Sequence, residues 1–463
     1  MDQSATRQRG APDHLQPVVP ESAGWRRAGR PRRSGAATVG GTRAWVITAM
    51  LMVLMMINFA DKAVLGLAAT SIRAEFGLTA AQYGTISSAF FLLFSISALV
   101  VGHLADRFST RTVLLVLALV WSVAMVPVIG PAGFTVILMS RVVLGAAEGP
   151  AFGVAQHAVH KWFADTDRGM PTALVSTATS IGVIIGAPVL SWLISAHGWR
   201  SAFVLVAVVG AVWCVVWLFV GRDGPIDAQS TTSTAGSVRP IDQVRVPLRS
   251  ILSSRTWLGA ALSAFAAYWS LALLISWVPA FLTDDLGHSK SAAGTLTALP
   301  WLVGMIALLV QGFATERMMR NGRSSSVARG IMPGIIVVVG GACILAFGYV
   351  HASALILVLM ALGLGLSGVA LAAGATACSE ISPVGQRGVV LGAYVGLYSL
   401  AGVIAPFVAG VLIDHAGGDP HSGYTVVFAL TGVIVVAGGV LAITLIRPER
   451  DTVRLIAAGS STP

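Results

Sequence analysis

Long apolar runs separated by short polar stretches dominate this chain. In lipid the backbone must satisfy its own hydrogen bonds, so a run of about 20 apolar residues spans the hydrocarbon core as a helix. The first run begins near Ala44 behind a long polar tail, and its position and length argue against a cleaved signal peptide. The pattern predicts twelve membrane helices, at 44–69, 82–104, 111–130, 133–160, 168–195, 200–220, 256–282, 291–315, 329–349, 353–377, 387–413 and 423–446.

The polar stretches predict how these helices are grouped. Residues 1–43 are rich in Arg, Gly, Pro and Ser, which predicts a disordered basic cytoplasmic tail. The stretch 221–255 is rich in Asp, Gln, Ser, Thr and Pro and reads as a cytoplasmic linker. It separates an amino-terminal six-helix bundle at 44–220 from a carboxy-terminal one at 256–446, and 447–463 form a second cytoplasmic tail.

Short motifs recur in the two bundles. Gly102-His-Leu-Ala-Asp-Arg107 closes the second helix, and Gly312-Phe-Ala-Thr-Glu-Arg317 closes the eighth, 210 residues later. Arg168-Gly169 opens the fifth helix and Arg387-Gly388 the eleventh, 219 residues later. Internal repeats of this kind are typical of secondary transporters, which bind substrate near mid-membrane between the repeats. We therefore expect an all-α membrane protein with two pseudo-symmetric six-helix halves.

Composition and charge support a membrane protein. The 463 residues are 55% hydrophobic and 11% charged, against roughly a quarter charged in a soluble domain. The net charge of +10 would suggest nucleic acid for a soluble protein, but here 25 of the 30 Lys and Arg residues fall on one side of the predicted membrane and three on the other. The positive-inside rule therefore puts both termini in the cytoplasm, in an inner or plasma membrane, with lipid and not nucleic acid as the partner.

Other chemistries find little support in the sequence. The three cysteines, Cys214, Cys343 and Cys378, lie in apolar runs and predict neither a disulfide framework nor a metal site. The sequence lacks the Gly-rich phosphate-binding loop of ATP-driven pumps and any catalytic constellation. We expect no cofactor and no enzymatic activity.

The repeated loop motif resembles a known family. Gly102, Asp106, Arg107 and Arg111 resemble the signature loop between helices 2 and 3 of the major facilitator superfamily, and Glu316 with Arg317 resembles its copy in the second half. The resemblance implies the major facilitator fold, a monomer, and a gating role in which these side chains bridge helix ends on the inner face. The alternative is that the arginines are topology charges alone.

A narrower resemblance is to the anion:cation symporter family, whose members import sugar acids and other organic anions with protons. Residues 58–62 (Asn-Phe-Ala-Asp-Lys) resemble its first-helix motif, and the segment from Arg141 through Glu148 to Phe152 resembles its fourth-helix motif. Phe59 and Phe94 stand where sugar-acid members tend to have tyrosine, and Lys62 replaces an arginine. These departures favour an aromatic or otherwise less polar carboxylate as substrate.

Four charged residues lie inside the apolar helices, at a cost of roughly 2.5–3.5 kcal/mol each at mid-bilayer. Arg141 and Glu148 are two turns apart and share a helix face. The resemblance puts their helix beside that of Asp61 and Lys62 at a central cavity. We expect Asp61 and Glu148 to carry protons and Lys62 and Arg141 to bind the anion.

The alternative for these charges is a static salt-bridge network between the two helices. The aromatic residues Phe59 and Phe94 and, from the second half, Tyr268, Trp269, Tyr394 and Tyr398 are further candidates to line the substrate site, with plain helix packing as the alternative.

Two other functions compete with import of an organic anion. A drug:proton antiporter has Gly and Pro adjacent in its fifth helix, whereas Gly186 and Pro188 are separated here by Ala187. Buried cations also favour anions over lipophilic cations. A membrane receptor without transport is the rival from another class, and vesicle uptake separates it from a transporter.

Overall fold

The computed structural model describes residues 40–104, 108–164, 167–226, 241, 246–347, 349–350, 352–417 and 419–460. This part of the chain is helical and contains no strand. Most of the predicted tail at 1–43 and of the linker at 221–255 lies outside the described residues, as do Asp106 and Arg107 of the signature loop. Gly102 lies near the end of a helix, in a stretch where the backbone alone is described.

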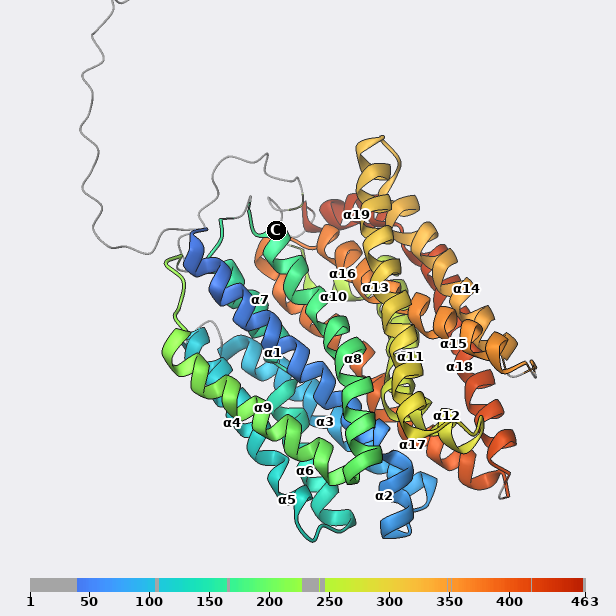
Figure 1. Ribbon diagram of the computed structural model, residues 1–463. Helices are drawn as coiled ribbons and strands as arrows, with labels where there is room; N and C mark the ends of the chain where they lie inside the picture. Colours follow the sequence, from blue (N-terminus) through green and yellow to red (C-terminus); the bar gives the residue numbers. More distant parts are fainter. Residues whose placement is uncertain are drawn as a thin grey trace, which may run out of the picture. The chain divides into compact units, whose positions relative to one another are not determined.

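The first half contains the helices of the predicted amino-terminal bundle, and several of them are broken (Figure 1). The fourth predicted helix divides at Gly149-Pro150, and the third divides just before Pro127. Proline has no N–H to bond the carbonyl four residues earlier, which interrupts the helix. The elements are α1 (Thr42–Leu67), α2 (Ala69–Phe76), α3 (Ala80–Leu104), α4 (Thr110–Ala124), α5 (Val126–Ile129), α6 (Phe134–Glu148), α7 (Ala151–His160), α8 (Gly169–His197) and α9 (Trp199–Val220).

The second half repeats this pattern, with a break before Pro279 that mirrors the break after α1. Its elements are α11 (Arg255–Ser276), α12 (Val278–Asp284), α13 (Lys290–Arg320), η2 (Val327–Ile331), α14 (Met332–Phe347), α15 (Ser353–Ser367), α16 (Val369–Glu380), η3 (Val384–Gln386), α17 (Arg387–His415) and α18 (Pro420–Leu445), with the short α10 (Leu248–Leu252) before it.

Within the carboxy-terminal segment expected as a tail, Pro448–Ser460 form helix α19. Asp451 of this helix is 1% exposed, and its carboxylate accepts a hydrogen bond from the Thr256 N–H at the start of α11. Glu449 likewise accepts hydrogen bonds from the backbone N–H groups of Ser325 and Ser326. These hydrogen bonds dock α19 against the ends of two neighbouring elements, whose free N–H groups they satisfy.

Eleven stretches of the described residues are long and apolar enough to cross a membrane. This count leaves out α3, whose 25 residues correspond to the second predicted span but whose last side chains lie outside the described part. Between the halves, α3 packs against α17, α8 against α13, and α1 against α11. We call the end of the bundle where α1 begins the tail side and the opposite end, with α2, α5 and α12, the far side (Figure 1).

On the far side the two halves approach to backbone contact. A Cβ atom at Gly66 of α1 would lie 1.9 Å from the Ile275 carbonyl oxygen of α11, and one at Gly84 of α3 would lie 2.4 Å from the Pro406 carbonyl oxygen of α17. Any larger residue would therefore push the halves apart. Glycine at these positions permits the close helix packing that holds membrane bundles together.

Polar contacts reinforce this closure. The carboxylate of Asp414 on α17 accepts hydrogen bonds of 2.8 Å from the backbone N–H groups of Ala80 and Ala81, which cap the start of α3. Further contacts join the halves on the same side. These are Thr70 with Thr283 and Asp284, Ser71 with Lys290, Tyr83 with the Ser276 carbonyl, and Ser88 with the Phe407 N–H. The described residues thus hold the far side closed.

Replacing Gly66 by Val is expected to open the far side, because the added side chain cannot coexist with the Ile275 carbonyl. In a background without the three native cysteines, a single cysteine at the buried position Ser276 reports the opening through its labelling rate with a water-soluble thiol reagent. We expect faster labelling in the Gly66→Val variant. Gly312→Val is the matched control, since nothing lies within 4 Å of a Cβ there. Equal labelling rates in the two variants would show that Gly66 does not set the closure.

Candidate functional site

The charged residues of α1 lie on its buried side. Asp61 is 0% exposed and Lys62 is 7% exposed. Asn58 and Lys62 are one turn apart, so they share a helix face, and the Lys62 ammonium donates a hydrogen bond to the Asn58 side-chain carbonyl. The same ammonium lies 4.2 Å from the ring centre of Phe59 and 5.4 Å from that of Phe94 on α3. A buried cation is thus held by one amide oxygen and two aromatic faces.

Helix α6 positions Arg141 and Glu148, which are both 1% exposed. Gly145 allows α6 to pack onto α3, since a Cβ there would lie 1.9 Å from the Phe90 carbonyl oxygen. Gly149 does the same one turn later, against the Phe94 carbonyl oxygen at 2.2 Å. Glu148 is the last residue of α6 before the Gly149-Pro150 break. These small residues bring the Glu148 carboxylate close to α1.

The two helices meet in a buried ion pair. The Lys62 ammonium and the Glu148 carboxylate are 3.1 Å apart, and their side chains are 5% and 0% exposed. The buried Asp61 carboxyl group lies near enough to Glu148, Arg141 and Lys62 to interact with them electrostatically. Neither Asp61 oxygen has a hydrogen-bond donor among the described residues. Two carboxyl groups and two cations thus form one cluster, as the sequence predicts.

Arg141 has unusual partners for a buried cation. One of its terminal nitrogens donates to the Met125 sulfur at 3.3 Å, and the guanidinium lies 5.2 Å from the ring centre of Phe203. Within the described residues no carboxylate lies within 4.0 Å of Arg141, and its Nε atom has no hydrogen-bond partner. A thioether and a ring neutralise a charge poorly, so this guanidinium retains donors for an anion.

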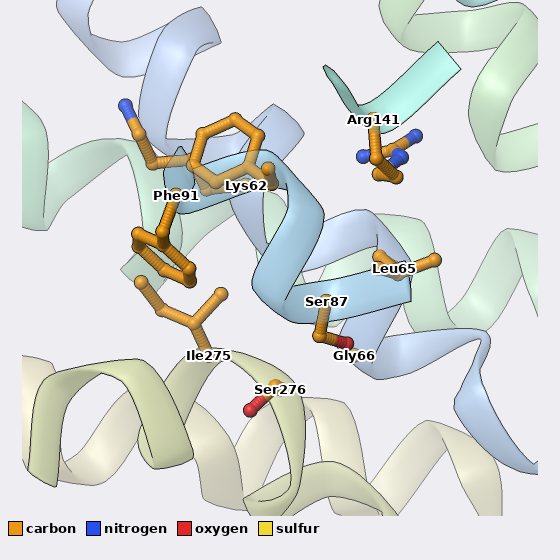
Figure 2. Close-up of a pocket in the computed structure, with 9 residues that line it drawn as sticks. Lys62, Leu65, Gly66, Ser87, Phe91, Arg141, Ile275 and Ser276 are labelled. Atoms are coloured by element: carbon orange, nitrogen blue, oxygen red, sulfur yellow. The ribbon is translucent and has the colours of Figure 1, made fainter. Parts of the chain in front are cut away.

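A small cavity adjoins the cluster (Figure 2). Its free volume of about 20 Å³ accommodates a single water molecule and no organic acid. With the far side closed, the cavity is too small for any ligand larger than water. The lining residues are Lys62, Leu65, Gly66, Ser87, Phe90, Phe91, Arg141, Ile275 and Ser276.

Sequence reasoning missed several of these residues, among them Ser87, Phe90 and Phe91 of α3. Ser87 and Phe91 lie seven and three residues before Phe94, so all three share one helix face. With Phe94 predicted to line the site, this spacing also predicts Ser87 and Phe91. The Ser87 hydroxyl is buried without a hydrogen-bond partner.

The predicted aromatic residues of the second half separate into two groups. Tyr268 of α11 faces the first half, with its ring centre 5.8 Å from that of Phe91, and the tilted ring of Tyr398 packs against it at 5.0 Å. Tyr394 is further away and donates its hydroxyl to the Leu371 carbonyl at 2.8 Å. Trp269 packs against Phe265 at 6.2 Å, with its buried Nε1–H lacking a partner. Tyr268 and Tyr398 are the members nearest to the charges.

The predicted gating residues that the structure describes, Gly102, Arg111, Glu316 and Arg317, lie on the tail side, apart from this cluster. The Arg111 side chain donates to the Leu218 carbonyl at 2.6 Å and so joins the ends of α4 and α9. Asp223 follows α9, and burial disfavours its charge, but hydrogen bonds from Ser109, Thr110 and the Arg111 N–H outweigh this and keep its pKa below the ordinary value. These contacts bridge helix ends within the first half.

The copy of the motif in the second half, with Glu316 and Arg317, is more exposed than Arg111. Glu316 pairs at 3.8 Å with Arg320 on the same helix, and both side chains are about two-thirds exposed. Exposed pairs of this kind contribute little to stability. A gating role for Arg317 and its neighbours stays a prediction, since no contact of theirs with the first half is among the described ones.

The comparison with family models decides the class of the protein. The model of the Major Facilitator Superfamily matches residues 51–365 and 260–461. The chain belongs to the Major Facilitator Superfamily. This facilitator is a membrane transporter and not an enzyme.

Individual relatives support the narrower resemblance. A hexuronate transporter from Bacillus subtilis is 27% identical over 407 residues, covering 85% of this chain and 92% of its own length. A probable sulfoacetate transporter from Cupriavidus necator is 28% identical, covering 87% and 94% of the two chains. These relatives, which are named as transporters of a sugar acid and of another organic acid, confirm that the chain resembles the anion:cation symporters.

Solved structures confirm the fold of the facilitator. The D-xylose-proton symporter superposes with a TM-score of 0.71 at 15% identity, covering 89% of this chain and 99% of its own. A bacterial homologue of the human lysosomal transporter Spinster gives a TM-score of 0.69 at 18% identity, covering 92% of this chain and 100% of its own. At these identities the likeness concerns the fold alone.

Removing one partner of the buried ion pair is expected to destabilise the facilitator strongly. Lys62→Met leaves the Glu148 charge buried without its partner, which costs about 3–5 kcal/mol, whereas the double variant Lys62→Met, Glu148→Gln removes both charges and costs less. Thermal unfolding in detergent measures this double-mutant cycle.

The exposed pair of Glu75 and Arg200, at 2.6 Å, provides the control for this cycle. Arg200→Met is expected to cost no more than about 1 kcal/mol because solvent screens the pair. If Lys62→Met proved as mild as Arg200→Met, the interpretation of the Lys62–Glu148 contact as a strong ion pair would be wrong.

Proposed function

We propose that this transporter imports a small organic carboxylate together with protons by alternating access. The observation that carries the proposal is the sealed cluster in which Lys62 pairs with Glu148 at 3.1 Å while the Asp61 carboxyl group lies next to Glu148. A charge cluster inside membrane helices is expensive and is functional by default. The cluster adjoins the cavity between the halves, where facilitators of this kind bind substrate.

Charge balance gives a route to coupling. With all four residues ionised, two carboxylates offset two cations. A proton taken up by Asp61 or Glu148 removes the repulsion between these neighbouring carboxyl groups and leaves the cluster with an excess of one positive charge. An anion bound by Arg141 and Lys62 then restores neutrality. Proton and anion thus favour each other's binding, because burying an unbalanced charge in this site costs far more than burying a balanced one.

The cations suit a carboxylate. Arg141 offers a planar donor group without a competing carboxylate within ion-pair distance, and Lys62 offers a second charge at the opposite wall of the cavity (Figure 2). The relatives named above as transporters of hexuronate and sulfoacetate share an acidic head group as their common chemistry. That shared chemistry supports an organic anion as the substrate here.

Alternating access follows from the closure of the far side. Contacts through Gly66, Gly84 and Asp414 must separate to admit substrate from that side and re-form to release it on the other. We propose that the tail side faces the cytoplasm of an inner or plasma membrane, since most of the Lys and Arg residues that the structure describes lie there. The transporter is proposed to act as a monomer.

Uptake into proteoliposomes tests the coupling. We expect the wild-type transporter to accumulate a labelled carboxylate from a panel that includes benzoate and glucuronate when the pH outside is lower than inside. In Glu148→Gln and Asp61→Asn, accumulation should fall by at least about tenfold, because a neutral amide cannot load and release a proton. Exchange of labelled for unlabelled substrate needs no net proton movement and should persist.

Glu75→Gln is the control, because this carboxylate is exposed on the far side and pairs with Arg200 outside the cluster. Arg200 and Trp199 donate hydrogen bonds to the Glu75 carboxylate and lower its pKa, so it stays ionised and should not load protons. Undiminished accumulation by both cluster variants would refute proton coupling through them. Uptake of no acid by the wild type would refute the proposed substrate class.

A further inference from the structure

Beside the charged cluster, the two halves meet through pairs of aromatic rings. Phe59 of α1 contacts Trp301 of α13 edge to face, with ring centres 5.8 Å apart. Phe91 of α3 contacts Tyr268 of α11 in the same way, also at 5.8 Å. Each pair takes one ring from each half, and Phe59 also carries the Lys62 ammonium on its face. These two contacts therefore open whenever the halves separate at this depth.

Further rings extend the aromatic lining. Phe90 and Phe94 pack against Phe91 at 5.0 and 6.4 Å, and Tyr398 packs against Tyr268 at 5.0 Å. Gly402 of α17 makes room for this arrangement, since a Cβ there would lie 2.6 Å from the Phe91 ring and 2.9 Å from the Tyr268 ring. The rings form an extended apolar surface that borders the cations on the side of the second half.

Free hydrogen-bonding groups are few in the same region. Ser95, Ser276 and Ser399 donate their hydroxyls to carbonyls of their own helices. Ser270 and Ser367 bond to each other at 2.6 Å. Apart from the charged cluster itself, whose Asp61 and Glu148 oxygens and Arg141 Nε also lack hydrogen-bond partners, the uncharged groups that the structure describes as buried without partners beside it are the Ser87 hydroxyl and the Asn58 amide nitrogen. A substrate with many hydroxyls would lose its hydration there without replacement, which penalises binding.

From these observations we infer that the site takes an aromatic carboxylate, with its carboxylate on Arg141 and Lys62 and its ring inserted between the inter-half pairs Phe59–Trp301 and Phe91–Tyr268. This inference rests on the proposed transport of an organic anion and deepens it. Each ring–ring contact broken by opening of the halves is replaced by an edge-to-face or stacked contact with the substrate ring. The substrate thereby bridges the two halves and favours their closure around it.

Calorimetric titration of the purified full-length transporter with three carboxylates tests the inference. Benzoate has a ring, cyclohexanecarboxylate has the same size without aromaticity, and glucuronate has several hydroxyls. We expect benzoate to bind at least about tenfold tighter than glucuronate, because glucuronate's hydroxyls find few partners. We expect cyclohexanecarboxylate to fall between them, because it fills the apolar space without the aromatic contacts.

Variants separate the ring subsite from the anion site. Trp301→Leu and Tyr268→Leu should each weaken benzoate binding by about tenfold and leave glucuronate binding nearly unchanged, since the ring faces that they remove contact an aromatic substrate and not the hydroxyls of a sugar acid. Trp301→Phe keeps a ring, should retain most of the benzoate affinity, and keeps the test open if Trp301→Leu folds poorly. Trp192→Leu and Tyr349→Leu are the matched controls, because these side chains are 57% and 75% exposed.

The outcomes distinguish the two proposals. Binding of glucuronate as tight as or tighter than benzoate, abolished by Arg141→Gln, would overturn the aromatic subsite and leave anion transport standing. Binding of none of the three acids would overturn the anion site itself. Loss of benzoate affinity in the control variants as large as in Trp301→Leu would also overturn the ring subsite.

Discussion

The ion pair between Lys62 and Glu148 is the constraint on which the rest of this structure depends. Neither charge tolerates the apolar surroundings alone, so α1 and α6 must stay together at one depth. Small residues and a helix break near Glu148 allow α6 to be placed in this way. Gly145 and Gly149 bring α6 onto α3, and the Gly149-Pro150 break ends α6 at the carboxylate. Arg141 and Asp61 complete a cluster whose total charge changes with a single proton.

The closure of the far side depends on a different kind of contact. There the halves meet through glycine and main-chain atoms, with Gly66 against Ile275 and the Asp414 carboxylate on the first N–H groups of α3. Contacts of this type involve few side-chain rotamers, so they can break and re-form with little rearrangement. The buried ion pair lies between two helices of the first half, so separating the halves does not by itself require breaking it.

The helices and the four buried charges could be predicted from the sequence because both follow from the intolerance of lipid for polar groups. Asp61, Lys62, Arg141 and Glu148 lie together as predicted. Helix α19 could not be found by apolarity, since it is held in place by polar contacts of Glu449 and Asp451 with N–H groups elsewhere. The use of Met125 by Arg141 and the separation of Tyr394 from Tyr268 depend on tertiary packing, which periodicity does not encode.

The buried charges of the described membrane helices all lie in the first half, while Trp301, Tyr268 and Tyr398 come from the second. This asymmetry has an evolutionary consequence. Under the proposed mechanism, a mutation among the second-half rings would alter which molecule fits without touching the charged residues of the cluster. Descendants of one ancestral carrier could therefore diversify their cargo by drift in one half, while selection on energy coupling kept the other half nearly constant.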